Sequence, residues 1–129
     1  MDIKEKLHNK NLYICSDENL LKEQFSYLEK LYDFNQTRPY ELDKRISLLK
    51  EMFASIGDGC YIEPPLHSNF GCHHVHFGNG VYANYNLTLV DDTFIYVGDN
   101  TMFGPNVTIA TAGHPIDPEL RKKVSKQHN

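Results

Sequence analysis

The period of the hydrophobic positions changes near residue 55. Before that point, apolar residues recur every three or four positions in two stretches, which is the spacing of one face of a helix. These positions are Leu21, Phe25, Leu28, Leu31 or Tyr32 in the first stretch and Leu42, Ile46, Leu49 and Phe53 in the second. The pattern predicts a helix from Asp17-Glu18 to about Asn35, with Ser16 as its N-cap. Thr37-Arg38-Pro39 interrupts this helix, because the residue before a proline leaves the helical region. A second helix follows and stops before Gly57.

After residue 55 the helical period disappears, and a short phrase of an apolar residue, a glycine and turn formers occurs three times. The copies are Ile56-Gly57-Asp58-Gly59, Phe77-Gly78-Asn79-Gly80 and Val97-Gly98-Asp99-Asn100, which begin 21 and then 20 residues apart. Each copy is followed six residues later by another apolar position, namely Ile62, Ala83 and Phe103. Three such hexads make roughly 18 residues, one coil of a triangular solenoid. The longer coils of this chain predict that one corner of each coil bulges.

The two halves of this pattern predict a mainly β protein with a helical cap. Residues 1–54 form the cap, and residues 55–129 form a β-helix with a loop after His114. A cap is expected because the open end of a solenoid presents unpaired backbone and apolar surface. The hexads continue to Ile109, which gives about two and a half coils. We therefore expect either a β-helix truncated at its C-terminal end or one that depends on contacts with other copies, since repeat folds generally need at least three repeats.

Composition narrows the function classes. The net charge is −4 and the pI is near 5.9, so nucleic acids and anionic membrane surfaces are poor partners. The chain has no apolar run of about 20 residues, the length that a bilayer span requires, and its charged N-terminus does not resemble a signal peptide. Its three cysteines lack disulfide or metal spacing and read as free thiols of a reducing compartment. These features predict a cytoplasmic protein.

Several ordered motifs resemble the maltose and galactoside O-acetyltransferases, and the similarity covers roughly residues 13 to 124. The motifs are Tyr82-Ala83-Asn84-Tyr85-Asn86, Val90-Asp91-Asp92, Val97-Gly98-Asp99-Asn100, Gly104-Pro105-Asn106-Val107-Thr108 and Ala112-Gly113-His114-Pro115. The resemblance implies a left-handed parallel β-helix of hexapeptide repeats, although general rules favour right-handed crossovers. It also implies an enzyme that transfers an acetyl group from acetyl-CoA to a sugar hydroxyl of the galactoside, maltose or glucose type, without a metal. A homotrimer with active sites between neighbouring subunits is expected.

His114 is the candidate general base. A sugar hydroxyl is a poor nucleophile near neutral pH, and an imidazole with an ordinary pKa near 6.5 suits the removal of its proton. Pro115 forces an extended backbone on His114. The chain contains seven histidines, so residue type alone does not select this one. His114 is selected by its match to the catalytic histidine of the resembled family.

Three further residues are candidates for the site, two of them from the resemblance and Tyr82 from its place beside Asn84. Asn84 matches an asparagine that binds substrate and stabilises the oxyanion, a donor role typically worth about 3 kcal/mol. Asp92 matches a residue that contacts the acceptor sugar, whereas adjacent carboxylates at a turn, such as Asp91 and Asp92, are usually solvated. Tyr82 could form the floor of the acceptor pocket, although an aromatic residue in a solenoid more often packs.

Two positions depart from the resembled family. Asn69 stands where a serine or aspartate is common, and it can still bond a sugar in a different way. Gln24 stands where an arginine is common in the N-terminal helix. The later coils of the family, which bind coenzyme A, have no counterpart after residue 129. The identity of the acceptor sugar and the completeness of the coenzyme A pocket therefore stay open.

Two alternatives come from other classes. The first is a metal site, because imidazoles suit Zn, Ni or Cu and several histidines cluster here: His67, His73, His74 and His76. No acidic or cysteine ligand at a recognised spacing completes the set, and accidental surface histidines are the default explanation. The second is a non-catalytic trimeric assembly module or truncated remnant, in which His114 has no catalytic function.

Overall fold

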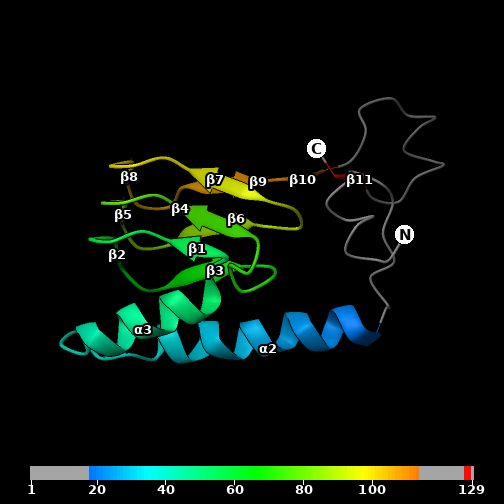
Figure 1. Cartoon of the computed structure of the whole chain (residues 1–129), viewed down its shortest axis with the longest axis horizontal. Coiled ribbons are helices and arrows are strands. Elements are labelled where there is room, and N and C mark those ends of the chain that lie inside the picture. The colour runs from blue at the N-terminus through cyan, green and yellow to red at the C-terminus, as the bar shows by residue number, and fades with distance from the viewer. Residues whose placement is uncertain (1–17, 114–126, 129) are drawn as a thin grey trace.

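The computed structural model describes residues 18–113 and 127–128, and the side chains of residues 18–111. Two helices precede a stack of short strands (Figure 1). The helices are α2 (Glu18–Asn35) and α3 (Leu42–Met52). The strands are β1 (Ser55–Ile56), β2 (Tyr61–Ile62), β3 (Leu66–Ser68), β4 (Val75–Phe77), β5 (Tyr82–Ala83), β6 (Leu87–Val90), β7 (Ile95–Val97), β8 (Met102–Phe103), β9 (Thr108–Ala110), β10 (Ala112–Gly113) and β11 (Gln127–His128). Both predicted helices are confirmed, and Ser16, the predicted N-cap, lies outside the described residues.

Nine of the described strands form three parallel sheets with the orders β1-β4-β7, β2-β5-β8 and β3-β6-β9. Each strand pairs with the strand three places further along the chain, which is the topology of a β-helix with three faces. Ser55 pairs with His76 and Val75 pairs with Ile95, so one coil closes after 21 residues and the next after 20. The repeat read from the glycine phrases is confirmed. Strands β10 and β11 form a separate antiparallel pair.

Three corners join the faces of each coil. We call them the first corner (after β1, β4 and β7), the second corner (after β2, β5 and β8) and the third corner (after β3 and β6). Residues in the left-handed region make these turns possible: Gly59, Gly71, Cys72, Gly80, Asn86, Asn100 and Asn106. At the second corner, Asn86 donates from Nδ2 to Oδ1 of Asn106 at 3.1 Å, so equivalent side chains bond from coil to coil.

The predicted bulge lies at the third corner of the first coil, in residues 69–74. The corresponding corner of the second coil needs only residues 91–94. The bulge brings Gly71 against helix α2: a Cβ placed on Gly71 would lie 2.5 Å from the carbonyl carbon of Tyr27. Gly71 also has a φ of +63°. The turn and the close approach of the helix therefore both require glycine at this position.

The core fills the interior of the coils and continues into the two helices that cover one end (Figure 1). Inward positions on the strands, such as Ile62, Ala83 and Leu87, are fully buried. The helices contribute Leu31, Phe34, Leu49, Met52 and Phe53. No helix in the described part of the chain combines the length and the apolar character that a membrane span requires.

The predicted helical stripes are partly wrong. Phe25 and Tyr32 of α2 and Leu42 and Ile46 of α3 are exposed, although all four share the apolar period. Leu42 and Ile46 border a cleft between α3 and the first coil rather than the core. Conversely, Arg45 is buried, because its guanidinium donates to Oγ1 of Thr37 and to the hydroxyl of Tyr61. A narrow β-helix end covers less of each helix than a full apolar stripe would suggest.

Asn35, the last residue of α2, satisfies the exposed edge of the first coil. Its Oδ1 accepts the backbone N–H of Leu66 at 2.8 Å, and its Nδ2 donates to the carbonyl oxygen of Leu66 at 2.8 Å. The side chain thus occupies both hydrogen-bonding groups of a residue on the first strand of its sheet. This contact fixes the C-terminal end of α2 to β3.

Candidate functional site

The third corner brings together two of the predicted substrate-binding residues. Nδ2 of Asn69 donates to Oδ1 of Asp92 at 3.1 Å, which joins the first coil to the second. From helix α2, Nε2 of Gln24 donates to the backbone carbonyl oxygen of Asn69 at 2.7 Å. The two positions that depart from the resembled family, Gln24 and Asn69, therefore touch each other. Helix, first coil and second coil each supply one polar side chain to this corner.

Asp91, the neighbour of Asp92, is an inward-facing carboxyl group that sequence reasoning missed. It is fully buried, and Asp92 is nearly so, which corrects the expectation of a solvated turn. Oδ1 of Asp91 accepts from Oγ of Ser68 at 2.7 Å and from the backbone N–H of Phe70 at 2.9 Å. Among the described residues, Oδ2 of Asp91 has no hydrogen-bond partner. The carboxyl group ties the bulged corner to the coil above it.

Burial changes the acid–base behaviour of this region. Desolvation raises the pKa of Asp91, although the hydrogen bonds from Ser68 and Phe70 oppose the shift. Desolvation also holds the pKa of the Cys72 thiol well above its usual range, and the nearby Asp91 carboxylate adds to this shift. Cys72 is fully buried and is therefore a packing residue of the corner rather than a nucleophile.

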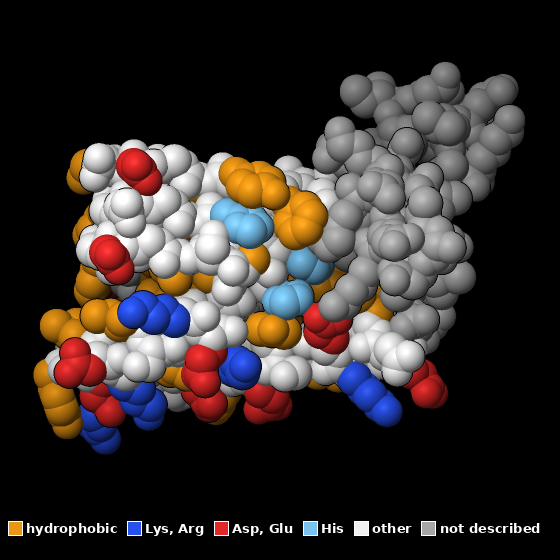
Figure 2. All heavy atoms as spheres, viewed as in Figure 1, with side chains coloured by type: hydrophobic (Ala, Val, Ile, Leu, Met, Phe, Trp, Pro, Cys, Tyr) orange, Lys and Arg blue, Asp and Glu red, His pale blue; other side chains and the backbone are white. Residues whose placement is uncertain are grey.

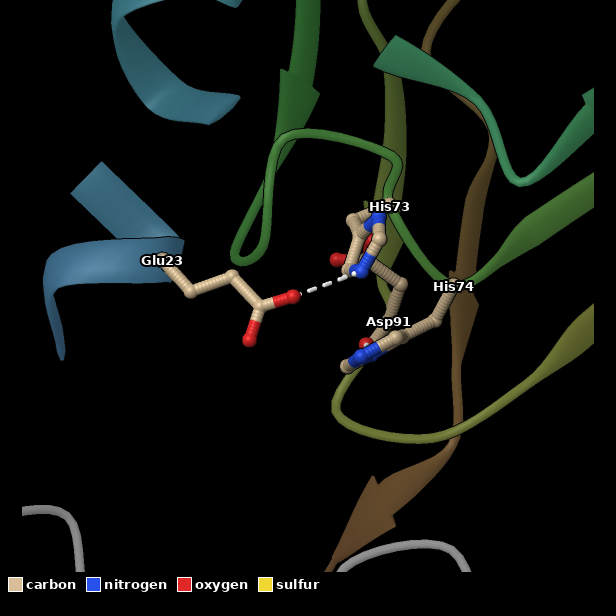
Figure 3. A network of polar contacts seen from close by, with 4 residues as sticks. All are labelled: Glu23, His73, His74 and Asp91. Carbon is tan, nitrogen blue, oxygen red and sulfur yellow. Dashed lines mark hydrogen bonds and ion pairs between the residues drawn. The ribbon is translucent and has the colours of Figure 1, made fainter. Parts of the chain in front are cut away.

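Histidines link the same corner to the helix (Figure 3). Nε2 of His73 lies 2.9 Å from Oε1 of Glu23, which reaches across from α2. The His73 ring also stacks on Tyr27, with centroids 4.0 Å apart. His74 is buried and donates from Nδ1 to the backbone carbonyl oxygen of Asp91 at 2.7 Å. The histidines thus hold the bulged corner against α2 and against the second coil.

The histidines do not assemble as metal ligands. Over the described residues, no group of three or more His, Cys, Asp or Glu side chains is placed to hold a metal ion. His67 lies on another face, where its Nε2 is 3.1 Å from Oδ1 of Asn86. His76 stacks on Tyr96 at 4.6 Å and belongs to an aromatic patch with Phe94. Figure 2 shows histidine and hydrophobic side chains gathered on the face of the molecule that carries this patch.

Tyr82 and Asn84 lie elsewhere in the coil. Tyr82 is on β5, and Asn84 follows it at the second corner, so the face of β6 separates them from the third corner. Oδ1 of Asn84 accepts the backbone N–H of Tyr85 at 2.8 Å. This bond orients the side-chain amide, so that its NH₂ end remains the donor for another group. Within one chain, the structure does not bring Asn84 close to Asp92.

A polar network behind Tyr82 positions its ring. Tyr82 stacks on Tyr61, with centroids 5.9 Å apart and an interplanar angle of 18°. The Tyr61 hydroxyl donates to Oε2 of Glu63 and accepts from Nη1 of Arg45 at 3.3 Å. The hydrogen bond to Glu63 raises the pKa of Tyr61. Arg45 of α3 thereby orients two stacked tyrosines on neighbouring coils.

His114, the predicted general base, lies outside the described residues. The chain approaches it through β10, which ends at Gly113. Thr111, three residues earlier, donates from Oγ1 and from its backbone N–H to the carbonyl oxygen of Val90. The backbone that leads to His114 therefore leaves the third coil directly above Val90-Asp91-Asp92.

Comparisons with known proteins identify the family of this chain. Residues 8–57 match the family model described as the maltose acetyltransferase hexapeptide capping motif. The structure of a galactoside acetyltransferase in complex with coenzyme A matches with a TM-score of 0.88 and 38% identity, covering 100% of this chain and 64% of that chain. A maltose O-acetyltransferase from Clostridium difficile 630 matches with a TM-score of 0.90 and 35% identity, covering 100% of this chain and 68% of that chain. The chain belongs to the maltose and galactoside O-acetyltransferase family.

Membership of this family confirms the predicted fold, a left-handed parallel β-helix of hexapeptide repeats with an N-terminal helical cap. Curated relatives extend the likeness to sequence. The galactoside O-acetyltransferase of Lactococcus lactis is 53% identical over 119 residues, which is 92% of this chain and 58% of that protein. The chain thus spans about three fifths of the length of that relative.

Proposed function

We propose that this chain is an acetyl-CoA-dependent O-acetyltransferase that acetylates a hydroxyl of a sugar of the galactoside, maltose or glucose type. The observation that carries the proposal is the contact between Asn69 and Asp92 at the third corner, held in place by Gln24. It joins a carboxylate and an amide from two coils, in a family of which one solved structure is a galactoside acetyltransferase in complex with coenzyme A. The proposal assigns the corner to the acceptor.

The chemistry of the corner suits a neutral polyol. Each carboxylate oxygen can accept more than one hydrogen bond, so a sugar hydroxyl can donate to Asp92 beside the bond that Asn69 already makes to it. The Asn69 amide offers both a donor and an acceptor beside it. Because Gln24 bonds the Asn69 backbone and leaves the Asn69 side chain on Asp92, the corner is held in one arrangement before the sugar binds.

The transfer we propose is direct. His114 removes the proton from the sugar hydroxyl, and the oxygen attacks the thioester carbonyl carbon of acetyl-CoA. Asn84, whose Oδ1 is already occupied by the Tyr85 backbone N–H, donates from its NH₂ end to the oxyanion of the tetrahedral intermediate. The carbon–sulfur bond then breaks, and the proton held by His114 passes to the departing thiolate. The products are the acetylated sugar and CoA, and no covalent enzyme intermediate forms.

The placement of these residues supports a site shared between neighbouring chains, for which we propose the homotrimer that the family resemblance implies. Tyr82 and Asn84 lie at the second corner, and Asn69 and Asp92 lie at the third, at opposite edges of the sheet formed by β3, β6 and β9. A single chain therefore does not close a site around both sets. We propose that the second corner of one chain faces the third corner of its neighbour, and that this assembly acts in the cytoplasm.

Calorimetric titration of the 129-residue chain with CoA tests the donor half of the proposal. Saturable binding near one CoA per chain supports an enzyme with a working donor site. A chain that binds no CoA yet remains trimeric by sedimentation would instead favour the assembly module.

Substitution of Asp92 tests the acceptor half. We expect Asp92→Asn to raise the acceptor KM about tenfold or more, since hydrogen bonds to a charged group contribute roughly 1.5–3 kcal/mol. The affinity for CoA should be unchanged. Asp58→Asn is the matched control, because Asp58 is an exposed carboxylate at the first corner. His114→Ala should abolish transfer while the trimer persists, and unchanged turnover in that variant would refute the general-base assignment.

A further inference from the structure

A groove runs between helix α2 and the outer surface of the sheet that contains β3 and β6. It has a volume of about 340 Å³. Leu28 and Tyr32 line it from the helix, His67 and Thr88 line it from the strands, and Asn69 lines it as well. Sites for small molecules begin at about 300 Å³, so the groove has the size of one small ligand portion.

The strand wall of the groove is mostly polar, apart from Leu66, and the helix wall is mostly apolar, apart from Asn35, whose side-chain amide is bonded to the Leu66 backbone. His67 and Thr88 are paired in register on β3 and β6, where they alternate with the buried residues Leu66, Leu87 and Leu89 and therefore face outward. Leu28 and the ring of Tyr32 form the opposite wall, and Tyr32 is 63% exposed although it lies on the apolar period of the helix. This contrast fits a ligand with one face of hydroxyls and one face of C–H groups.

The charge of the groove lining narrows the class of ligand further. The described residues that line the groove include no aspartate, glutamate, lysine or arginine. A phosphorylated or carboxylated ligand would therefore find no ionic partner here, whereas a neutral sugar ring would find hydroxyl, imidazole and amide groups beside an aromatic face.

The groove and the proposed acceptor corner share Asn69. The side chain of Asn69 bonds Asp92 on one side, and the residue borders the groove on the other. A sugar held by Asp92 can thus extend through its glycosidic bond toward Tyr32 and Thr88. We propose that this groove is a subsite for a second neutral sugar ring of the acceptor, so that the preferred substrate is a disaccharide rather than a single ring. This inference rests on the assignment of the third corner to the acceptor.

Kinetics with paired acceptors test the subsite. The pairs are lactose against methyl β-galactoside and maltose against glucose, each at saturating acetyl-CoA. We expect Tyr32→Ala to raise KM for the disaccharide of the active pair roughly fivefold, with less than a twofold change for the single ring, because loss of a packed aromatic face weakens only the second ring. Tyr40→Ala is the matched control, since Tyr40 is also an exposed tyrosine but does not line the groove. Equal changes for both members of a pair would overturn the subsite.

A blocking variant keeps the test independent of Tyr32. Thr88→Phe fills the groove from the strand wall and should selectively remove the advantage of the disaccharide. Loss of activity toward both acceptors together with loss of the trimer would show that the groove is an interface between copies, which overturns the proposal. If no sugar is acetylated, the proposed function fails. Calorimetry with lactose and maltose then decides the subsite separately: binding that Thr88→Phe abolishes supports it, and absence of binding refutes it.

Discussion

Replacement of Gly71 by alanine tests how tightly helix α2 is held against the bulged third corner. Gly71 has a φ of +63°, and an added Cβ would lie 2.5 Å from the Tyr27 carbonyl carbon and 2.6 Å from both its Cβ and its carbonyl oxygen. Two of these atoms are backbone, so a rotamer change of Tyr27 cannot relieve the contact. The helix must shift away from the corner, or the corner must deform.

The expected cost has two parts. A left-handed conformation costs an alanine about 1–2 kcal/mol, which the lower entropy of the unfolded alanine variant offsets by about 0.4–1 kcal/mol. Overpacking against the helix adds about 1–3 kcal/mol. Gly71→Ala should therefore lower the free energy of unfolding by about 2–4 kcal/mol. Gly59→Ala isolates the first part, because Gly59 has a φ of +71° and nothing within 4 Å of its added Cβ. We expect a loss of about 1 kcal/mol there.

Urea denaturation followed by circular dichroism measures both variants against the wild type. The same shift of α2 moves Gln24 away from the Asn69 backbone, so Gly71→Ala should also raise the acceptor KM, whereas Gly59→Ala should not. Losses of stability that agree within about 0.5 kcal/mol for the two variants would refute the argument, because the contact with Tyr27 would then cost nothing.

Three further predictions concern the same end of the molecule. Burial raises the pKa of Asp91 in the folded state, so the stability that its protonation contributes is present below the unfolded pKa and is lost as the pH rises through the folded pKa. Urea titrations from pH 4 to 7 should therefore show the wild type losing stability relative to Asp91→Asn. A difference between the two proteins that stays constant with pH would contradict this. Asn35→Ala leaves the N–H and C=O of Leu66 without their side-chain partner and should cost about 2–4 kcal/mol in the same assay, with Asn35→Asp intermediate because only the donor is lost. Glu23→Gln removes the carboxylate that lies 2.9 Å from Nε2 of the partly exposed His73 and should cost at most about 1 kcal/mol, with any contribution of charge smaller in 1 M NaCl. A loss that is large and independent of salt would point to a different role.

Local patterns predicted much of the fold. The glycine phrases gave the coil length because each phrase marks the same corner, and the registers of β1 with β4 and of β4 with β7 follow that spacing. The apolar period located both helices. On α3 it identified Leu49 but not Arg45 as buried, because the partners of Arg45 are Thr37 and the Tyr61 hydroxyl, and a helical wheel contains neither.

The candidate site was predicted less completely. Asp92 was predicted from a motif and Asn69 from a position that departs from the resembled family, and the structure places the two side chains in contact. Asp91 was missed, since its partners Ser68 and the Phe70 backbone become neighbours only when the coil closes. The sequence carried one signal for Asp91. It directly follows Val90, the last residue of β6, and so lies at the corner above the bulge of the first coil.

At the third corner, substitutions on helix α2 and substitutions in the coils have different structural consequences. Gln24 reaches Asn69 across 45 positions of sequence, from a helix that lies outside the coils. Coil residues such as Asp91 are constrained by neighbours above and below, so a substitution there disturbs the stacking of the repeat. A residue on α2 that borders the corner or the groove has no such neighbours on its outer side. The helix can therefore accumulate substitutions that alter ligand preference while the β-helix remains unchanged, and related proteins should differ in specificity first along this helix.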